Sequence, residues 1–306
     1  MTACKIYEFN EEKNMESNRP ELTKRWPEAL IILQSIIYGF GDPISKIAME
    51  VTPVYAMMTV RYGMAFLVCF MLFGKRIIET VKTVPPKAWL IPGMCIGLSY
   101  LLNNVALSMT DATSVAFLRS LSVVITPAFA FLIYKTRYRW QLILIQILVL
   151  PGMYLLCVRG GLSGFGIGEI IALLAAALMA GALVFSKNYL EMVDPVSMTA
   201  LQAACSTVLA VVGSIFIEGG IHLETTTPQA WLIIVYLAVL CTFLGFLMQN
   251  LALTRIDGRK VSLIQCICPV MTAVFAFIML GEHLSAAGIV GALIIVACII
   301  AGSFEQ

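Results

Sequence analysis

Charge is scarce in this sequence: Asp, Glu, Lys and Arg together make up only 12% of its 306 residues, against about 25% in a typical soluble domain. The net charge of +2 is too small to indicate a nucleic-acid partner. Apolar residues make up 60% of the chain, more than a soluble fold of this size can bury, so we expect the excess to face lipid. The composition therefore predicts an integral membrane protein surrounded by the lipid bilayer.

Catalytic and cofactor motifs are missing as well. The sequence contains no Walker loop, dinucleotide fingerprint, metal-ligand cluster or pair of catalytic carboxylates, so we expect no cofactor and no metal. The nine cysteines are scattered through apolar runs, which is typical of helix packing and not of a disulfide or zinc framework. A Gly-x-Ser-Gly string at residues 161–164 matches the surroundings of an intramembrane protease serine. Because both histidines lie in or near predicted loops, we interpret the string as a hinge loop.

Ten apolar runs are long enough to cross a bilayer, which takes about 17–25 residues. Short connections with turn signals, such as Asp194-Pro195 and Asp257-Gly258, separate them. The predicted spans are residues 28–49, 53–74, 87–107, 112–134, 140–158, 167–188, 196–217, 229–252, 260–280 and 285–303. The sequence thus predicts an all-α integral membrane fold of ten transmembrane helices.

Lys and Arg lie mostly on one side of these spans. They are concentrated in the N-terminal segment and in the loops after spans 2, 4, 6 and 8, whereas the opposite loops carry only Arg159, with Lys46 near the end of span 1. Because cytoplasmic loops are enriched in Lys and Arg, both termini are expected in the cytoplasm. Residues 1–27 lack the apolar core of a signal peptide and are interpreted as a cytoplasmic polar tail. We expect a multi-pass protein of the inner (plasma) membrane.

An internal repeat divides the chain. Residues 101–136 align without a gap with residues 247–282, and the aligned pairs include Asn104/Asn250, Ala106/Ala252, Leu107/Leu253, Asp111/Asp257 and Thr126/Thr272. Shared apolar composition would not readily align Asn, Asp and Thr together. The alignment pairs spans 3 and 4 with spans 8 and 9, which gives two five-helix halves, residues 28–160 and 161–306. Five is odd, so the second half enters the membrane from the opposite side, and the halves are predicted to be inverted repeats.

The chain resembles the EamA-type members of the drug/metabolite transporter superfamily over nearly all its length. The resembling stretches are Tyr38-Gly-Phe…Lys46, Leu101 to Thr126, Gly168-Glu169 and Leu280 to Ser285. The resemblance implies a 5+5 inverted fold with a central cavity formed by spans 1–4 and 6–9, with spans 5 and 10 peripheral. It also implies transport of small metabolites such as amino acids, nucleobases or quaternary amines, often outward. Asp42-Pro43 and Arg119 depart from the pattern usual in relatives, so the substrate is not carried over.

Three charged residues inside the predicted spans are the first candidate site: Asp42, Arg61 and Arg119. Each lies seven or eight residues from the outer end of its span, which places it about 10–12 Å deep at about 1.5 Å per residue. A charge at the centre of a membrane helix costs about 2.5–3.5 kcal/mol on insertion scales. We expect the three side chains to meet. They form either a structural ion-pair cluster or a substrate-binding or proton-coupling site whose net charge of +1 favours a carboxylate.

Polar side chains without charge form the second candidate set. They are Tyr38, Asn103, Asn104, Gln249, Asn250 and Gln265, with Gln34 nearby in span 1. The amides either hydrogen-bond between helices, which contributes about 0.6–2 kcal/mol each, or line the cavity. Two glycines and a proline between Gly39 and Pro43 weaken span 1, and they predict either a structural kink or an unwound binding segment.

Together these features predict a secondary active transporter with no catalytic residue. Its substrate is expected to be a small metabolite, an amino acid or a related polar or anionic compound, and export is the expected direction. Protons are the candidate coupling ion, and the protein is expected to be a monomer or a homodimer. A channel is the first alternative, although no loop resembles a selectivity filter. A membrane enzyme is the second, although no nucleophile-and-base pair is present.

Overall fold

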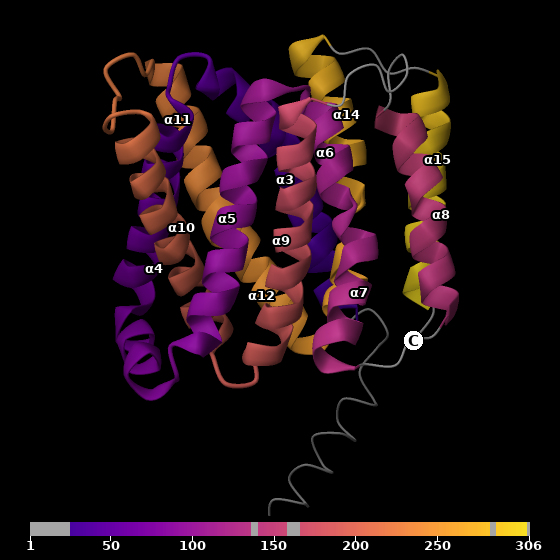
Figure 1. The fold of residues 1–306 in the computed structure, drawn as a ribbon, viewed down its shortest axis with the longest axis horizontal. Helices are drawn as coiled ribbons and strands as arrows, with labels where there is room; N and C mark the ends of the chain where they lie inside the picture. Colours follow the sequence, from indigo (N-terminus) through magenta and orange to yellow (C-terminus); the bar gives the residue numbers. More distant parts are fainter. Residues whose placement is uncertain (1–24, 136–139, 158–165, 282–285, 305–306) are drawn as a thin grey trace, which may run out of the picture.

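The computed structural model describes residues 25–135, 140–157, 166–281 and 286–304 (Figure 1). All regular secondary structure in these ranges is helical. A helix satisfies its backbone N–H and C=O groups within one segment, which is required wherever water is absent. The predicted all-α class is therefore confirmed. Most of the predicted polar tail (residues 1–27), the Gly-x-Ser-Gly string and one of the two histidines, His283, lie outside the described residues.

The helices coincide closely with the predicted spans. In chain order they are α3 (Trp26–Met49), α4 (Val54–Thr83), α5 (Lys87–Met109), α6 (Ala112–Ser120), α7 (Ser122–Tyr134), α8 (Trp140–Cys157), α9 (Ile167–Tyr189), α10 (Pro195–Ile217), α11 (Pro228–Tyr236), the π-helix η1 (Leu237–Leu244), α12 (Gly245–Arg255), α13 (Gly258–Ile264), α14 (Ile267–Leu280) and α15 (Ala286–Phe304). Among the described residues, seven stretches are long and apolar enough to cross a membrane: α4, α5, α6–α7, α9, α10, α11–η1–α12 and α13–α14. The three other predicted spans coincide with α3, α8 and α15.

The second span is longer than predicted. We expected it to end at residue 74, before Lys75 and Arg76, but α4 continues to Thr83, with a non-helical backbone at Phe73 (φ −132°, ψ 18°). Ile77 in the added segment is buried in an apolar cluster with residues of α10. Packing of the Ile77 face stabilises the helical conformation of this basic segment. The charges of Lys75 and Arg76 did not predict that the helix continues.

Two of the predicted spans are interrupted near their middle. The span 112–134 consists of α6 and α7, which are separated at Leu121, and the span 260–280 consists of α13 and α14, which are separated at Gln265 and Cys266. Pro269 has no N–H to donate to the Gln265 carbonyl, which accepts instead from the Cys268 N–H at 2.9 Å. Each pair of helices together is still long and apolar enough to cross a membrane, as predicted for both spans.

Residues paired by the repeat alignment adopt matching local structures. Asp111 and Asp257 stand directly before α6 and α13 with extended backbones. Lys135 and Gly281 end α7 and α14 with left-handed backbones, φ 51° and 65°, a conformation common at helix C-termini. The two interruptions also fall at corresponding places. The sequence repeat is thus accompanied by a repeat of helix starts, breaks and ends.

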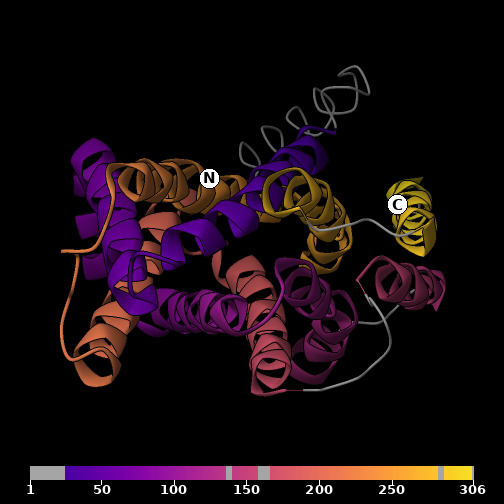
Figure 2. The same ribbon diagram turned by 90° about the horizontal axis from the view of Figure 1, so that it is seen from above.

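Helices from the two sequence halves interdigitate. α3 packs on α14 and α12, α4 packs on α10, and α5 packs on α9 and α10. α8 and α15 pack on each other at one side of this body (Figures 1 and 2). Large apolar side chains such as Met71, Phe216 and Leu232 are exposed on the outside, as expected of a surface that faces lipid. The buried polar side chains lie in the core between the two halves.

α3 runs without interruption through Gly39 to Pro43, so this segment is not an unwound binding segment. A Cβ on Gly39 would lie 2.9 Å from the backbone nitrogen of Thr272, which means that the absent side chain lets α3 and α14 approach closely.

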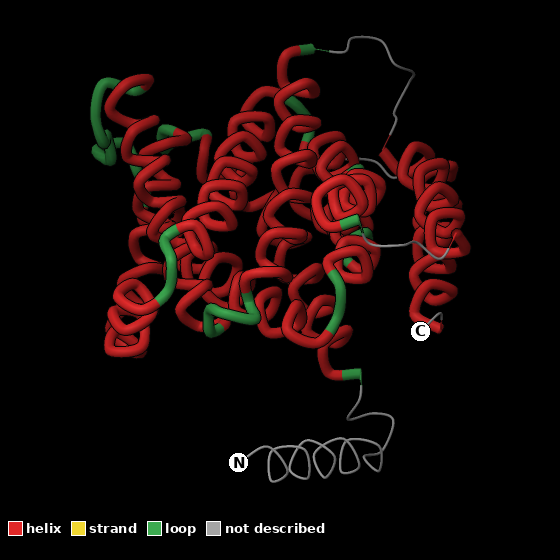
Figure 3. The backbone as a smooth tube through the Cα atoms, turned by 60° about the horizontal axis from the view of Figure 1, so that its bottom comes forward, coloured by secondary structure: helices red, strands yellow, loops and turns green. Residues whose placement is uncertain are grey.

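We name the two ends of the bundle after the first and last residues of α3, the Trp26 end and the Met49 end. The short loops at the ends are visible in Figure 3.

Candidate functional site

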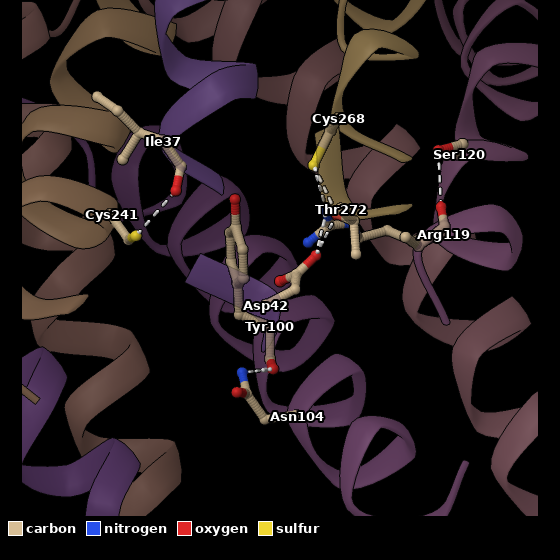
Figure 4. Close-up of polar contacts among 10 residues, drawn as sticks. Ile37, Asp42, Tyr100, Asn104, Arg119, Ser120, Cys241, Cys268 and Thr272 are labelled. Atoms are coloured by element: carbon tan, nitrogen blue, oxygen red, sulfur yellow. Dashed lines mark hydrogen bonds and ion pairs between the residues drawn. The ribbon is translucent and has the colours of Figure 1, made fainter. Parts of the chain in front are cut away.

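An ion pair joins three helices in the middle of the bundle. Nη2 of Arg119 on α6 lies 3.1 Å from Oδ2 of Asp42 on α3, and the same nitrogen lies 2.9 Å from Sγ of Cys268 on α14. Oγ1 of Thr272 donates to the same carboxylate oxygen at 3.5 Å (Figure 4). The side chains of Arg119 and Asp42 are only 9% and 14% exposed. The predicted contact between Asp42 and Arg119 is therefore confirmed.

Arg61 does not join this pair. Its Nε donates to Oγ1 of Thr242 at 2.9 Å, and that hydroxyl donates in turn to the Leu237 carbonyl at 3.0 Å within η1. The reason is the neighbourhood of α4, which packs on α10 and η1. The expectation that all three charges meet is therefore wrong for Arg61. Equal depth along the spans did not make Arg61 a neighbour of α3 and α6.

Three glutamine side chains form a second polar cluster, which we call the amide triad: Gln34 on α3, Gln249 on α12 and Gln265 at the break between α13 and α14. Oε1 of Gln249 accepts from Nε2 of Gln265 at 2.9 Å and from Nε2 of Gln34 at 3.3 Å. Nε2 of Gln265 also donates to Oε1 of Gln34 at 3.2 Å. Nε2 of Gln249 is buried without a hydrogen-bond partner. A buried donor of this kind is stabilised by an incoming acceptor.

A small cavity lies between the ion pair and the amide triad. Its volume is about 20 Å³, enough for about one water molecule. Its polar lining comes from Tyr38, Tyr100, Arg119, Ser120, Ser122, Ser262, Gln265 and Cys268. Arg119 and Gln265 are partners in the repeat alignment, so the same position in each half contributes to one cavity. The cavity thus lies where the two halves meet. Arg119 contributes a charged group to its lining, and Gln265 contributes an amide.

A larger cavity opens nearer the Trp26 end; we call it the vestibule. Its volume is about 200 Å³, and its lining includes Thr126, Ala130, Tyr134, Lys187, Asn188, Glu191, Asp257 and Arg259. Thr126 lies one turn after Ser122 and donates to its carbonyl at 2.7 Å. On α13, Ser262 donates to the Arg259 carbonyl at 2.8 Å. The vestibule and the central cavity are therefore lined by adjacent turns of α7 and α13.

The Met49 end is tied together by polar contacts between elements. Nζ of Lys46 donates to the Thr110 carbonyl at 3.0 Å. Both carboxylate oxygens of Glu218, directly after α10, accept from the first backbone N–H groups of α4 at 2.8 and 2.9 Å. Thr225 donates to the Val51 carbonyl at 2.6 Å. The ends of α3, α4, α5 and α10 are thus joined here, while residues of α7, α9 and α13 line the vestibule at the other end.

The asparagines lie away from the cavity lining. Nδ2 of Asn250 donates to Thr199 and Gln202 on α10 at 3.0 and 2.8 Å, which connects two helices. Nδ2 of Asn104 donates to the Tyr100 carbonyl of its own helix at 2.8 Å. Asn103 is buried, and its Oδ1 has no partner. Of the uncharged candidates, Tyr38 and Gln265 line the central cavity, Gln249 contacts it through Gln265, and Asn250 acts as a link between helices.

The sequence profile of the EamA-like transporter family matches this chain twice, at residues 25–158 and again at residues 166–303. The chain belongs to the EamA-like transporter family. This family is part of the drug/metabolite transporter superfamily, so the EamA chain is a multi-pass membrane protein, and its membership favours a transporter over an enzyme.

Relatives agree with this EamA assignment. An uncharacterized transporter of Archaeoglobus fulgidus is 25% identical over 270 residues, 88% of this chain and 83% of that protein. The uncharacterized transporter YcxC of Bacillus subtilis is 23% identical over 289 residues, 90% and 91% of the two chains. A crystal structure matches with a TM-score of 0.75 at 16% identity and covers 91% of this chain and 99% of that one. That likeness concerns the fold alone.

Sequence reasoning missed three partners in this EamA site: Thr242, Cys268 and Thr272. Thr272 was visible only as the repeat partner of Thr126, and Cys268 was interpreted as a small apolar residue. The alignment held a signal for Cys268, because it pairs Cys268 with Ser122 and both line the central cavity. No sequence signal paired Thr242 with Arg61, since that contact depends on which helix α4 packs against.

Proposed function

We propose that this EamA-family protein is a secondary transporter that moves a small polar or anionic metabolite across the inner (plasma) membrane by alternating access. One observation carries the proposal: the central cavity lies between the two sequence halves, and adjacent turns of α7 and α13 connect its lining to a vestibule at one end of the bundle. A binding site at the interface of two repeats, open to one side at a time, is how inverted-repeat transporters work.

The topology belongs to the same proposal. Ten spans, in two inverted halves at residues 28–160 and 161–306, place the Trp26 end and both termini in the cytoplasm, because Lys and Arg are enriched in the loops at that end. The vestibule then admits substrate from the cytoplasm, and the closed Met49 end faces outward. Export is the expected direction, since the cytoplasmic substrate meets the open side.

The ion pair supports a substrate with a carboxylate or another anionic group. Arg119 lines the central cavity and can bind a carboxylate through two parallel hydrogen bonds. In this structure one nitrogen of that guanidinium donates a hydrogen bond to Asp42. A substrate carboxylate therefore competes with Asp42 for the guanidinium of Arg119.

The experiment combines ligand binding with transport. Purified protein is screened against small metabolites for a rise in melting temperature, because a ligand that binds only the folded state stabilises it. A metabolite that raises the melting temperature is then tested for saturable counterflow in proteoliposomes. We expect counterflow with an anionic metabolite; flux without saturation or counterflow would indicate a channel and contradict the proposal.

Two arginine variants sharpen this test. Arg119→Gln should abolish the ligand-induced rise in melting temperature and the counterflow, because it removes the cationic group from the cavity. Arg61→Gln is the matched control, since Arg61 is equally buried but donates to Thr242 outside the cavity lining. It should lower the melting temperature of the ligand-free protein and leave the ligand-induced rise intact. Equal losses of the ligand response in both variants would contradict a specific role for Arg119.

A further inference from the structure

Two lysines occupy the same place in the first helix of each half. Ser45-Lys46 lies near the end of α3 and is followed by Glu50, and Ser186-Lys187 lies near the end of α9 and is followed by Glu191 with the same spacing. If the halves are inverted, as in the proposed function on which this inference rests, these helix ends lie at opposite ends of the bundle. Their surroundings in the structure can therefore be compared directly.

At the Met49 end, Lys46 holds the end of α5 and the start of α6. Its Nζ donates to the Thr110 carbonyl, directly after α5, at 3.0 Å and lies 3.8 Å from Oδ1 of Asp111. The last carbonyls of a helix have no partner within the helix and carry partial negative charge, so a lysine there is stabilised. An apolar cluster that includes Leu107 of α5 and Val115 of α6 packs the same two helices against each other. The lysine and the apolar cluster close this end together.

At the Trp26 end, Lys187 contacts a backbone carbonyl at the end of a helix, as Lys46 does, but it does not contact the aspartate that follows. Nζ of Lys187 donates to the Leu253 carbonyl of α12 at 2.8 Å. In the repeat alignment Leu253 corresponds to Leu107, about one turn before the position that Lys46 holds. Asp257, the partner of Asp111 in the alignment, is bound by Nη2 of Arg259 at 2.7 Å. Lys187 and Asp257 both line the vestibule without pairing with each other.

We propose that Lys187 and Asp257 form the gate at the Trp26 end and that this gate alternates with Lys46 and Asp111. When the vestibule closes, Lys187 moves one turn along the end of α12, to the Ile256 carbonyl and Asp257, and Asp257 exchanges Arg259 for Lys187. In the same transition Lys46 leaves Thr110 and Asp111, and the Met49 end opens. Each lysine thus stabilises the closed state of its own end, and the balance between them sets the ratio of the two states.

Hydrogen–deuterium exchange on the purified full-length protein tests this mechanism. Lys46→Met should raise exchange of residues 106–118 at the Met49 end, and Lys187→Met should lower it, because the exchange rate of a protected segment follows the fraction of molecules open there. Partly exposed ion pairs shift such a ratio by about two- to fivefold. Asp257→Asn should act in the same direction as Lys187→Met. Lys82→Met is the control, because Lys82 is exposed on α4 outside both gates, and it should leave exchange unchanged.

The double variant Lys46→Met/Lys187→Met distinguishes a gate from a local loss of stability at the Met49 end. If the lysines compete, exchange of residues 106–118 returns towards the wild-type rate. If Lys46→Met only loosens the Met49 end, the second substitution at the opposite end has no effect on that segment, and the gate proposal is refuted. Counterflow is measured separately in the same variants. Transport with unchanged exchange would overturn the gate and leave the proposed function standing, whereas opposite exchange shifts without counterflow would overturn the proposed function alone.

Discussion

The ion pair between Asp42 and Arg119 yields the sharpest prediction about stability. In Asp42→Asn, the guanidinium of Arg119 stays buried with Cys268 as its remaining neighbour from this cluster. Removing one partner of a buried ion pair typically costs about 3–5 kcal/mol, because the other charge is left uncompensated. We expect Asp42→Asn to lower the free energy of unfolding by that amount. Arg119→Gln should cost less, since a buried carboxyl can take up a proton and become neutral, whereas an arginine cannot lose one.

The double variant decides whether the two residues act as a unit. Asp42→Asn/Arg119→Gln removes both charges, so it should be no less stable than Asp42→Asn alone, and the coupling energy should be at least as large as the cost of Arg119→Gln alone. Reversible unfolding in mixed detergent micelles measures the four free energies. Asp257→Asn is the control, because its side chain is 53% exposed and such pairs contribute only about 0–1 kcal/mol. Additive losses in the double variant would refute the idea that burial makes this pair interdependent.

Three further predictions concern two single contacts and the membrane topology. Gly39→Ala should destabilise the protein by about 1–3 kcal/mol in the same assay, because the new Cβ pushes α14 away from α3; full stability would contradict the close approach. Thr242→Val should cost about 1–3 kcal/mol by removing the acceptor of Arg61, whereas Thr242→Ser should cost less because it keeps the hydroxyl. Single cysteines in residues 108–112 and 218–227 should react with a membrane-impermeant reagent on intact cells; protection there, with labelling near Arg137, would reverse the proposed topology.

The sequence by itself determined the helices and their order. Apolar runs of membrane length located α3 to α15, because a chain without water must form its backbone hydrogen bonds locally. The repeat pairing Asp111 with Asp257 was also readable, and the structure adds matching helix starts, breaks and ends. Burial depth along a helix is a one-dimensional property, so the sequence could place Asp42 and Arg119 at a common level and predict their contact.

Only the tertiary structure decided which side chains face one another around the bundle. Arg61 was placed at the same depth as Asp42, yet it donates to Thr242, because α4 packs on α10 and η1. Such pairing depends on how each helix is rotated and on which helix lies beside it, and hydropathy records neither. The amide triad and the vestibule arise in the same way. Each is a property of several helices packed together, so no single segment of the sequence contains it.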